Sequence, residues 1–215
     1  NRIKYLAEKK IYLKNTSPTF VINWFDRNPP LGGIGKIKLA EAYLEQGKLV
    51  EVEKLIKEAW PTAEISKNDL GYYRAKFKKF LTSDDHLKRA DYLAWEKKYW
   101  DLKRMLKYLP SDERALYNAR QILMSNSYGV DNAIAKVPTH LKNNPGLEFD
   151  RLRWRNRRGR LEGSLEILYK NANKTESQMI RPDLWWEQRK SVARSLIYKK
   201  RYKTAYKISS EHSLS

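Results

Sequence analysis

The sequence predicts an all-α protein built as a solenoid of helical hairpins. Three observations support this fold class. Apolar residues recur at helical spacing along most of the 215-residue chain, the two-residue alternation of a β-strand is scarce, and a helix–turn–helix pattern repeats. Gly and Pro interrupt the helices too often for the unbroken heptads of a coiled coil.

The clearest hairpin lies between residues 37 and 59. The first helix carries its apolar face on Ile37, Ala40, Tyr43 and Leu44. We expect Gly47 just past its C-terminus, where glycine is favoured because it adopts a left-handed backbone without strain. Apolar residues return at helical spacing from 49 to 59, and Pro61 ends this second helix.

The hairpin recurs four more times along the chain. Each repeat has a small or apolar anchor in its first helix, a turn residue seven positions later, and core positions after twelve and sixteen. The five aligned sets are Ala40, Gly47, Val52 and Ile56; Ala90, Lys97, Leu102 and Leu106; Ala119, Asn126, Asp131 and Ala135; Leu152, Gly159, Ser164 and Leu168; and Ala193, Lys200, Ala205 and Ser209. The fourth position fails in the last set, where the neighbouring Ile208 and not Ser209 is apolar. An irregular period of about 30 to 50 residues is typical of a helical solenoid, and the unit resembles a tetratricopeptide-type hairpin.

Two further helices are predicted outside the hairpins, at residues 1–14 and 66–81. Acidic residues follow three serines that we expect at helix N-termini, where free N–H groups favour oxygen acceptors and anions: Ser66, Ser83 and Ser111. Prolines fall at predicted boundaries, at positions Pro110, Pro138, Pro145 and Pro182. Residues 143–146 (Asn-Asn-Pro-Gly) are the best predicted loop.

The composition excludes several classes of protein. The chain has no cysteine, which excludes a disulfide framework and a cysteine-ligated metal site. No stretch approaches the about 18 apolar residues of a membrane span. Hydrophobic residues make up 41% of the chain, too many for a wholly disordered basic tail.

The chain is strongly basic. Its 44 Lys and Arg against 25 Asp and Glu give a formal net charge of +19, which attracts polyanions such as nucleic acid, anionic lipid or an anionic polymer. The chain is also rich in Lys, Asn and Ile, so a compositional bias of the genome is the alternative explanation. We find no basic residue recurring at one position of the aligned hairpins, as a reader of one base per repeat requires, and this disfavours nucleic acid as a partner.

Six arginines and a tryptophan within residues 151–160 form the densest basic cluster. The candidate binding residues are Arg151, Arg153, Trp154, Arg155, Arg157, Arg158 and Arg160. Arginine forks bind carboxylates and phosphates well, and a tryptophan among them can stack on a base or a sugar. On a helix, Arg151, Arg155 and Arg158 share one side while Leu152 faces the core. The alternative is a solvated face whose arginines pair with acids on neighbouring hairpins.

No catalytic, metal-binding or cofactor-binding residue is predicted. The segment 32–36 (Gly-Gly-Ile-Gly-Lys) lacks the spacing and the preceding strand of a phosphate-binding loop. His86, His140 and His212 lie far apart, and none has a second ligand at helical spacing. Tryptophans in helical repeats mostly pack between helices, and we expect this of Trp24, Trp60, Trp95, Trp100 and at least one of Trp185 and Trp186.

Three segments have residue patterns that are similar to those of a known protein family. The first is 24–31, Trp-Phe-Asp-Arg-Asn-Pro-Pro-Leu; the second is 145–154, Pro-Gly-Leu-Glu-Phe-Asp-Arg-Leu-Arg-Trp, followed by Arg-Arg-Gly at 157–159; the third is 181–189, Arg-Pro-Asp-Leu-Trp-Trp-Glu-Gln-Arg, followed by Thr-Ala-Tyr at 204–206. Together they resemble the N-terminal superhelical domain of soluble lytic murein transglycosylases in their alphaproteobacterial form. The resemblance covers most of the chain from about Phe20.

This resemblance implies a right-handed superhelix over residues 1–215, a single non-catalytic domain of a longer, periplasmic parent chain. The family cleaves peptidoglycan glycan strands without water, as a glycan lyase, through one glutamate of a separate C-terminal domain. The implied partners are peptidoglycan, that catalytic domain and other cell-wall proteins. The chain begins at Asn1 without a signal peptide, so we expect it to be a processed piece.

The sequence departs from the family at the catalytic motif. The only Glu-Ser pair, Glu176-Ser177, is not followed by the family's Gly-Leu-Met-Gln stretch and sits in a predicted connector. Catalysis is therefore not assigned to Glu176. Two alternatives remain open: a tetratricopeptide-like scaffold for protein–protein interaction, and, less favoured, a nucleic-acid-binding helical repeat.

Overall fold

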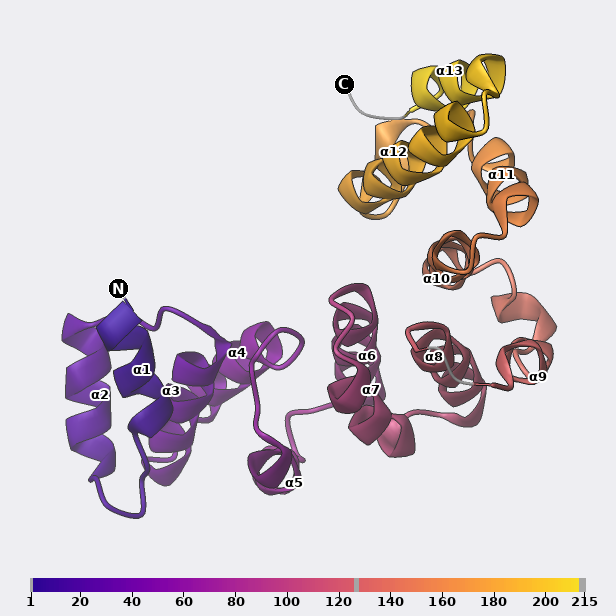
Figure 1. Cartoon of the computed structure of the whole chain (residues 1–215). Helices are drawn as coiled ribbons and strands as arrows, with labels where there is room; N and C mark the ends of the chain where they lie inside the picture. Colours follow the sequence, from indigo (N-terminus) through magenta and orange to yellow (C-terminus); the bar gives the residue numbers. More distant parts are fainter. Residues whose placement is uncertain (1, 126–127, 213–215) are drawn as a thin grey trace. The chain divides into compact units, whose positions relative to one another are not determined.

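The computed structural model describes residues 2–125 and 128–212. These residues form thirteen α-helices and three short 3₁₀ segments, and no strand occurs among them (Figure 1). The predicted all-α class is confirmed. The chain divides into two compact units, residues 1–110 and residues 111–215.

The first unit contains seven α-helices and one 3₁₀ turn. They are α1 (Arg2–Lys10), α2 (Pro18–Arg27), α3 (Gly33–Glu45), α4 (Leu49–Ala59), α5 (Lys67–Lys76), α6 (Ser83–Trp95), α7 (Tyr99–Met105) and η1 (Leu106–Tyr108). Helix α3 packs against α1, α2 and α4. Side chains from α2 and α3 share one part of the core, made of Val21, Ile22, Phe25, Leu39 and Ala42.

The second unit contains six α-helices and two 3₁₀ turns. They are α8 (Ser111–Leu123), α9 (Val130–Ala135), η2 (Thr139–Leu141), α10 (Pro145–Arg157), α11 (Leu161–Lys170), η3 (Glu176–Gln178), α12 (Pro182–Tyr198) and α13 (Tyr202–Ser210). Helix α10 is central, because it packs against α8, α11 and α12.

All five predicted hairpins are pairs of packed helices. They are α3–α4, α6–α7, α8–α9, α10–α11 and α12–α13 (Figure 1). Most of the aligned core positions are buried, including all five anchors, Ala40, Ala90, Ala119, Leu152 and Ala193. In the last pair the core position is Ile208 and not Ser209, as its apolar side chain indicated.

Four hairpins share one turn geometry. The predicted turn residues Gly47, Lys97, Gly159 and Lys200 all have a left-handed backbone, with φ between 57° and 73°. The next residue donates its N–H to a carbonyl five positions back, as Lys48 does to Tyr43 at 3.0 Å. This bond and the one from Gly47 to Leu44 form a Schellman motif, which satisfies the last carbonyls of the first helix.

The third hairpin departs from the predicted register. Helix α9 begins two residues later, relative to the anchor Ala119, than the second helix of the other pairs. Its buried positions are therefore Ala133 and Val137, while the predicted Asp131 and Ala135 are exposed. The longer turn is the physical reason for the shift. The predicted turn residue Asn126 lies outside the described residues.

Several predicted ends and packing roles were wrong. The helix expected at 66–81 ends at Lys76, although Ser66 does cap it by accepting from the N–H of Asp69. Thr82, not Ser83, caps α6, in a reciprocal capping box with Asp85. Trp100 was expected to pack between helices, but its side chain is 64% exposed.

Three other boundaries also differ from the prediction. The helix expected at 1–14 ends at Lys10, and Ser111 is the first residue of α8. The predicted loop at 143–146 starts α10, with Asn144 as its cap. Helix α2 was not predicted, although Ser17 followed by Pro18 is a recognisable start signal because Pro is favoured in a first turn.

The turn geometry predicts opposite effects for two glycine substitutions in the first unit. Gly47→Ala forces a Cβ into the left-handed region and should lower the free energy of unfolding by about 1–2 kcal/mol. Gly71→Ala, inside α5 with no atom within 4 Å of the new Cβ, should raise it by about 0.5–1 kcal/mol. Urea unfolding followed by circular dichroism measures both, and equal signs would contradict the assignment of the turn.

Candidate functional site

The arginine-rich segment lies on α10 and on the turn that follows it. Arg153 is buried and donates to Asp150 at 2.9 Å. Arg155 reaches α11, where it donates to the Gly163 carbonyl at 2.6 Å and to Glu166 at 2.9 Å. These two arginines therefore have partners within their own hairpin, α10–α11, and not on a neighbouring hairpin as the alternative prediction expected.

Asp150 is the centre of a buried charge network. It is 1% exposed and accepts from Arg120 Nε at 2.8 Å as well as from Arg153. Arg120 is fully buried, and its guanidinium fills the space that a Cβ on Gly146 would occupy, at 2.3 Å from Cζ. Burial lowers the pKa of Arg153 while Asp150 opposes that shift. The network joins α8 to α10, so its arginines are structural.

Arg157 has a different structural role. It donates to the carbonyls of Leu123, Met124 and Ser125 at 3.0, 3.2 and 2.9 Å, at the C-terminus of α8. The last carbonyls of a helix have no partner within that helix. Arg157 thus caps the neighbouring helix α8, although the residue itself stays exposed.

Two other arginines repeat this capping. Arg89 is buried on α6 and donates to the carbonyls of Trp60 and Ala63 at 2.6 and 3.0 Å, just beyond α4. Arg189 is buried on α12 and donates to the carbonyl of Ile208 at 2.8 Å, in the last turn of α13. The sequence alignment missed these pairs because they join residues 19 to 29 positions apart.

Three of the candidate arginines, Arg157, Arg158 and Arg160, are exposed. The guanidinium carbons of Arg158 and Arg160 lie 5.8 and 4.7 Å from the centre of the Trp154 ring. Arg151 is half-buried. Trp154 is buried, so its ring supports these two arginines and is not open for stacking on a sugar or a base. The candidate patch is therefore smaller than the sequence suggested.

A basic residue follows the left-handed residue in all four matching turns. These residues are Lys48, Lys98, Arg160 and Arg201, each at the start of the second helix of its hairpin. This position lies eight residues after four of the five anchors, whereas Ser127 follows Ala119 at the same distance in the sequence. A basic residue therefore recurs in four hairpins, but not in every hairpin as a reader of one base per repeat requires. Lys48, Lys98 and Arg160 are exposed, and Arg201 is half-buried and pairs with Glu162.

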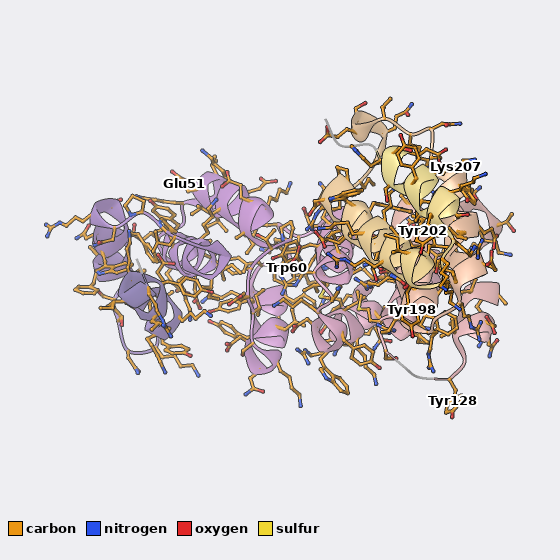
Figure 2. The ribbon with its side chains drawn as sticks, turned by 45° about the horizontal axis from the view of Figure 1, so that its top comes forward. Glu51, Trp60, Tyr128, Tyr198, Tyr202 and Lys207 are labelled. Atoms are coloured by element: carbon orange, nitrogen blue, oxygen red, sulfur yellow. The ribbon has the colours of Figure 1, made fainter. Side chains whose placement is uncertain are left out.

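Exposed aromatic residues gather on the last hairpin. Tyr198 is 89% exposed, and Tyr202 and Tyr206 are also exposed, on α12 and α13 (Figure 2). The side chains of Lys199, Lys200 and Lys203 are exposed around them in the sequence. Aromatic rings that have a polar tip are common at interfaces, so this hairpin offers contact area as well as charge.

The histidines and Glu176 form no shared site among the described residues. His86 accepts from Trp60 Nε1 at 3.2 Å, and burial lowers its pKa. His140 lies 3.7 Å from Asp112, and His212 lies against the Trp186 ring. Within the described ranges no group of His, Asp and Glu could hold a metal ion. Glu176 lies exposed in η3, in the predicted connector.

The buried network predicts a large effect at Asp150. Asp150→Ala leaves two buried guanidinium groups without their carboxylate and should lower the free energy of unfolding by about 3–5 kcal/mol. Asp183→Ala is the matched control, because it removes an exposed partner of Arg181 and should cost less than about 1 kcal/mol. Urea unfolding of both variants tests this, and similar losses would refute the structural role of the network.

Comparisons with known proteins add no relative. No protein-family model, curated protein or solved structure matches this chain. In the part of the chain that the structure describes, no helix is both long and apolar enough to cross a membrane. The resemblance to the superhelical domain of lytic transglycosylases therefore stays a prediction.

Proposed function

We propose that this chain is a non-catalytic, polymer-binding domain built as a right-handed superhelical solenoid of tetratricopeptide-like hairpins. Its ligand is anionic peptidoglycan, and its parent is a periplasmic lytic murein transglycosylase whose separate catalytic domain cleaves the glycan. The observation that carries the proposal is the recurrent turn, which presents one basic residue at the same place in four hairpins.

The charge of these turns matches the chemistry of the polymer. Peptidoglycan stem peptides carry free carboxylates at regular intervals, and a strongly basic surface attracts such a polymer over long range. Lys48 and Lys98 at the turns are exposed, and the flexible stem of a lysine lets its ammonium adapt to an irregular ligand. A repeated, adaptable set of cations suits a repeating polyanion better than one small ligand.

Exposed aromatic side chains add a second kind of contact. Trp100 is exposed and follows the basic turn of its hairpin. Tyr202, labelled in Figure 2, is the first residue of α13. Flat amphipathic rings next to cations suit a ligand that carries both sugars and carboxylates. The exposed Glu176 in η3 takes no catalytic part in this proposal.

Charge removal at the turns tests the proposal. A variant with Lys48→Gln, Lys98→Gln, Arg160→Gln and Arg201→Gln should bind purified sacculi about tenfold more weakly at low salt, because exposed charges contribute about 0.3–1 kcal/mol each. The control removes four lysines outside the turns and leaves the same net charge: Lys14→Gln, Lys67→Gln, Lys136→Gln and Lys142→Gln. Co-sedimentation with sacculi at several salt concentrations measures both.

Three outcomes would contradict the proposal. Equal losses in both variants would mean that net charge, not the turns, holds the polymer. Release of anhydro-muropeptides by this chain alone would refute its non-catalytic role. Tight RNA binding at physiological salt, without binding to sacculi, would favour the nucleic-acid alternative.

A further inference from the structure

The first unit has an open cavity, and Lys98 is the one turn residue of the proposed polymer-binding set that lines it. Its volume is about 560 Å³, the size of a small-molecule site. It is lined by residues from α1, α3, α5, α6 and α7 and from the segment between α4 and α5. Tyr12, Ile34 and Leu93 give it apolar walls, and Lys38 lies among them.

Lys38 is a buried cation without a polar partner. Its side chain belongs to α3, is 2% exposed, and lines the cavity. The ammonium lies 4.1 Å from the centre of the Tyr12 ring and 5.5 Å from that of Tyr73. Among the described residues it makes no hydrogen bond and no ion pair. Because the side chain lines the open cavity, solvent or a ligand in the cavity can reach the ammonium and complete its hydrogen bonds.

The nearby carboxylates are engaged elsewhere. Glu41 accepts from Tyr72 and, at 3.0 Å, from Lys76. Asp69 accepts from Ser66 Oγ at 2.7 Å. Both acids raise the pKa of Lys38 through space, but burial outweighs them and lowers it. The charge of Lys38 is therefore available to a bound anion.

The rest of the cavity is also positive on balance. Its lining holds five cationic residues and three carboxylates, Glu64, Asp69 and Asp101. Lys9 is already paired with Glu64 at 2.8 Å, and Arg89 caps the chain beyond α4. Only one buried cation remains uncommitted, which suits a single negative charge and not the dianion of a phosphate ester.

We propose that this cavity binds an organic carboxylate, which accepts hydrogen bonds from Lys38 Nζ and lays its apolar body against Tyr12, Ile34 and Leu93. The source is either a small free acid or the C-terminal end of a peptide, which present the same group. The site depends on this cavity alone and stands whether or not the proposed function is correct.

Nuclear magnetic resonance of lysine side chains tests the site directly. The protein is labelled with ¹³C at the lysine ε-carbons, and Lys38→Arg identifies the Lys38 signal by its loss. N-acetyl-alanine is titrated against its neutral amide. We expect the acid to shift the Lys38 signal saturably and the amide to leave it unchanged. N-acetyl-alanyl-alanine is the second probe, and its tighter binding would identify a peptide end as the source.

A matched pair of variants completes the test. Lys38→Met should weaken binding of the acid at least about tenfold, measured by calorimetry, the loss expected for one charged hydrogen bond. Lys36→Met on the same helix removes a lysine that pairs with Glu58 at 2.8 Å outside the cavity, and should leave binding unchanged. Lys38→Met should also melt no lower than the natural chain, since it removes an unpaired buried charge.

Any of four results would overturn this inference. They are a Lys38 signal that no acid shifts, an equal shift by the amide, a response to inorganic phosphate alone, and equal losses of binding in Lys38→Met and Lys36→Met. The signal of the natural chain decides the question even if Lys38→Met fails to fold.

Discussion

Within each of the two units, buried arginines donate hydrogen bonds to acceptors on other helices, and these bonds hold the helices of that unit together. Arg89 and Arg189 each donate to carbonyls at the end of a neighbouring helix, and Arg120 donates to the buried Asp150. A helix of about ten residues leaves a large share of its carbonyls unpaired, so capping from outside matters most in a fold of short helices. Hydrophobic contacts pack the hairpins, but these bonds fix which helix ends meet.

The hairpins themselves follow from local sequence. A turn residue such as Gly47 and its apolar flanks lie within about twenty positions, so both helices and the left-handed turn were predictable from spacing alone. Lys97 and Lys200 occupy the same conformation without glycine, and only the alignment revealed them. The predicted core positions of the α8–α9 hairpin were wrong because its longer turn shifts the buried residues to Ala133 and Val137. No local sequence rule predicts the length of that turn.

The candidate sites depend on long-range contacts, and sequence reasoning was weaker there. The cluster around Arg153 was found by its density, but its burial against Asp150 and Arg120 depends on how α8 meets α10. The cavity around Lys38 could not be predicted, because its walls come from segments between residues 9 and 101. In the sequence, Lys38 is one lysine among many on a helix. Only the packing of Tyr12 and Tyr73 against it distinguishes this lysine from the exposed ones.

The positive charge thus divides into a buried, structural part and an exposed part, to which we assign the proposed ligand binding. This division is the central claim. It is tested most directly by exchange of arginine Nε–H groups with D₂O, followed in ¹H–¹⁵N spectra. Arg120 should keep its proton long after transfer, because Nε is buried and donates to Asp150, whereas Arg160 at its exposed turn should exchange at once. Equally fast exchange at the two residues would contradict the claim.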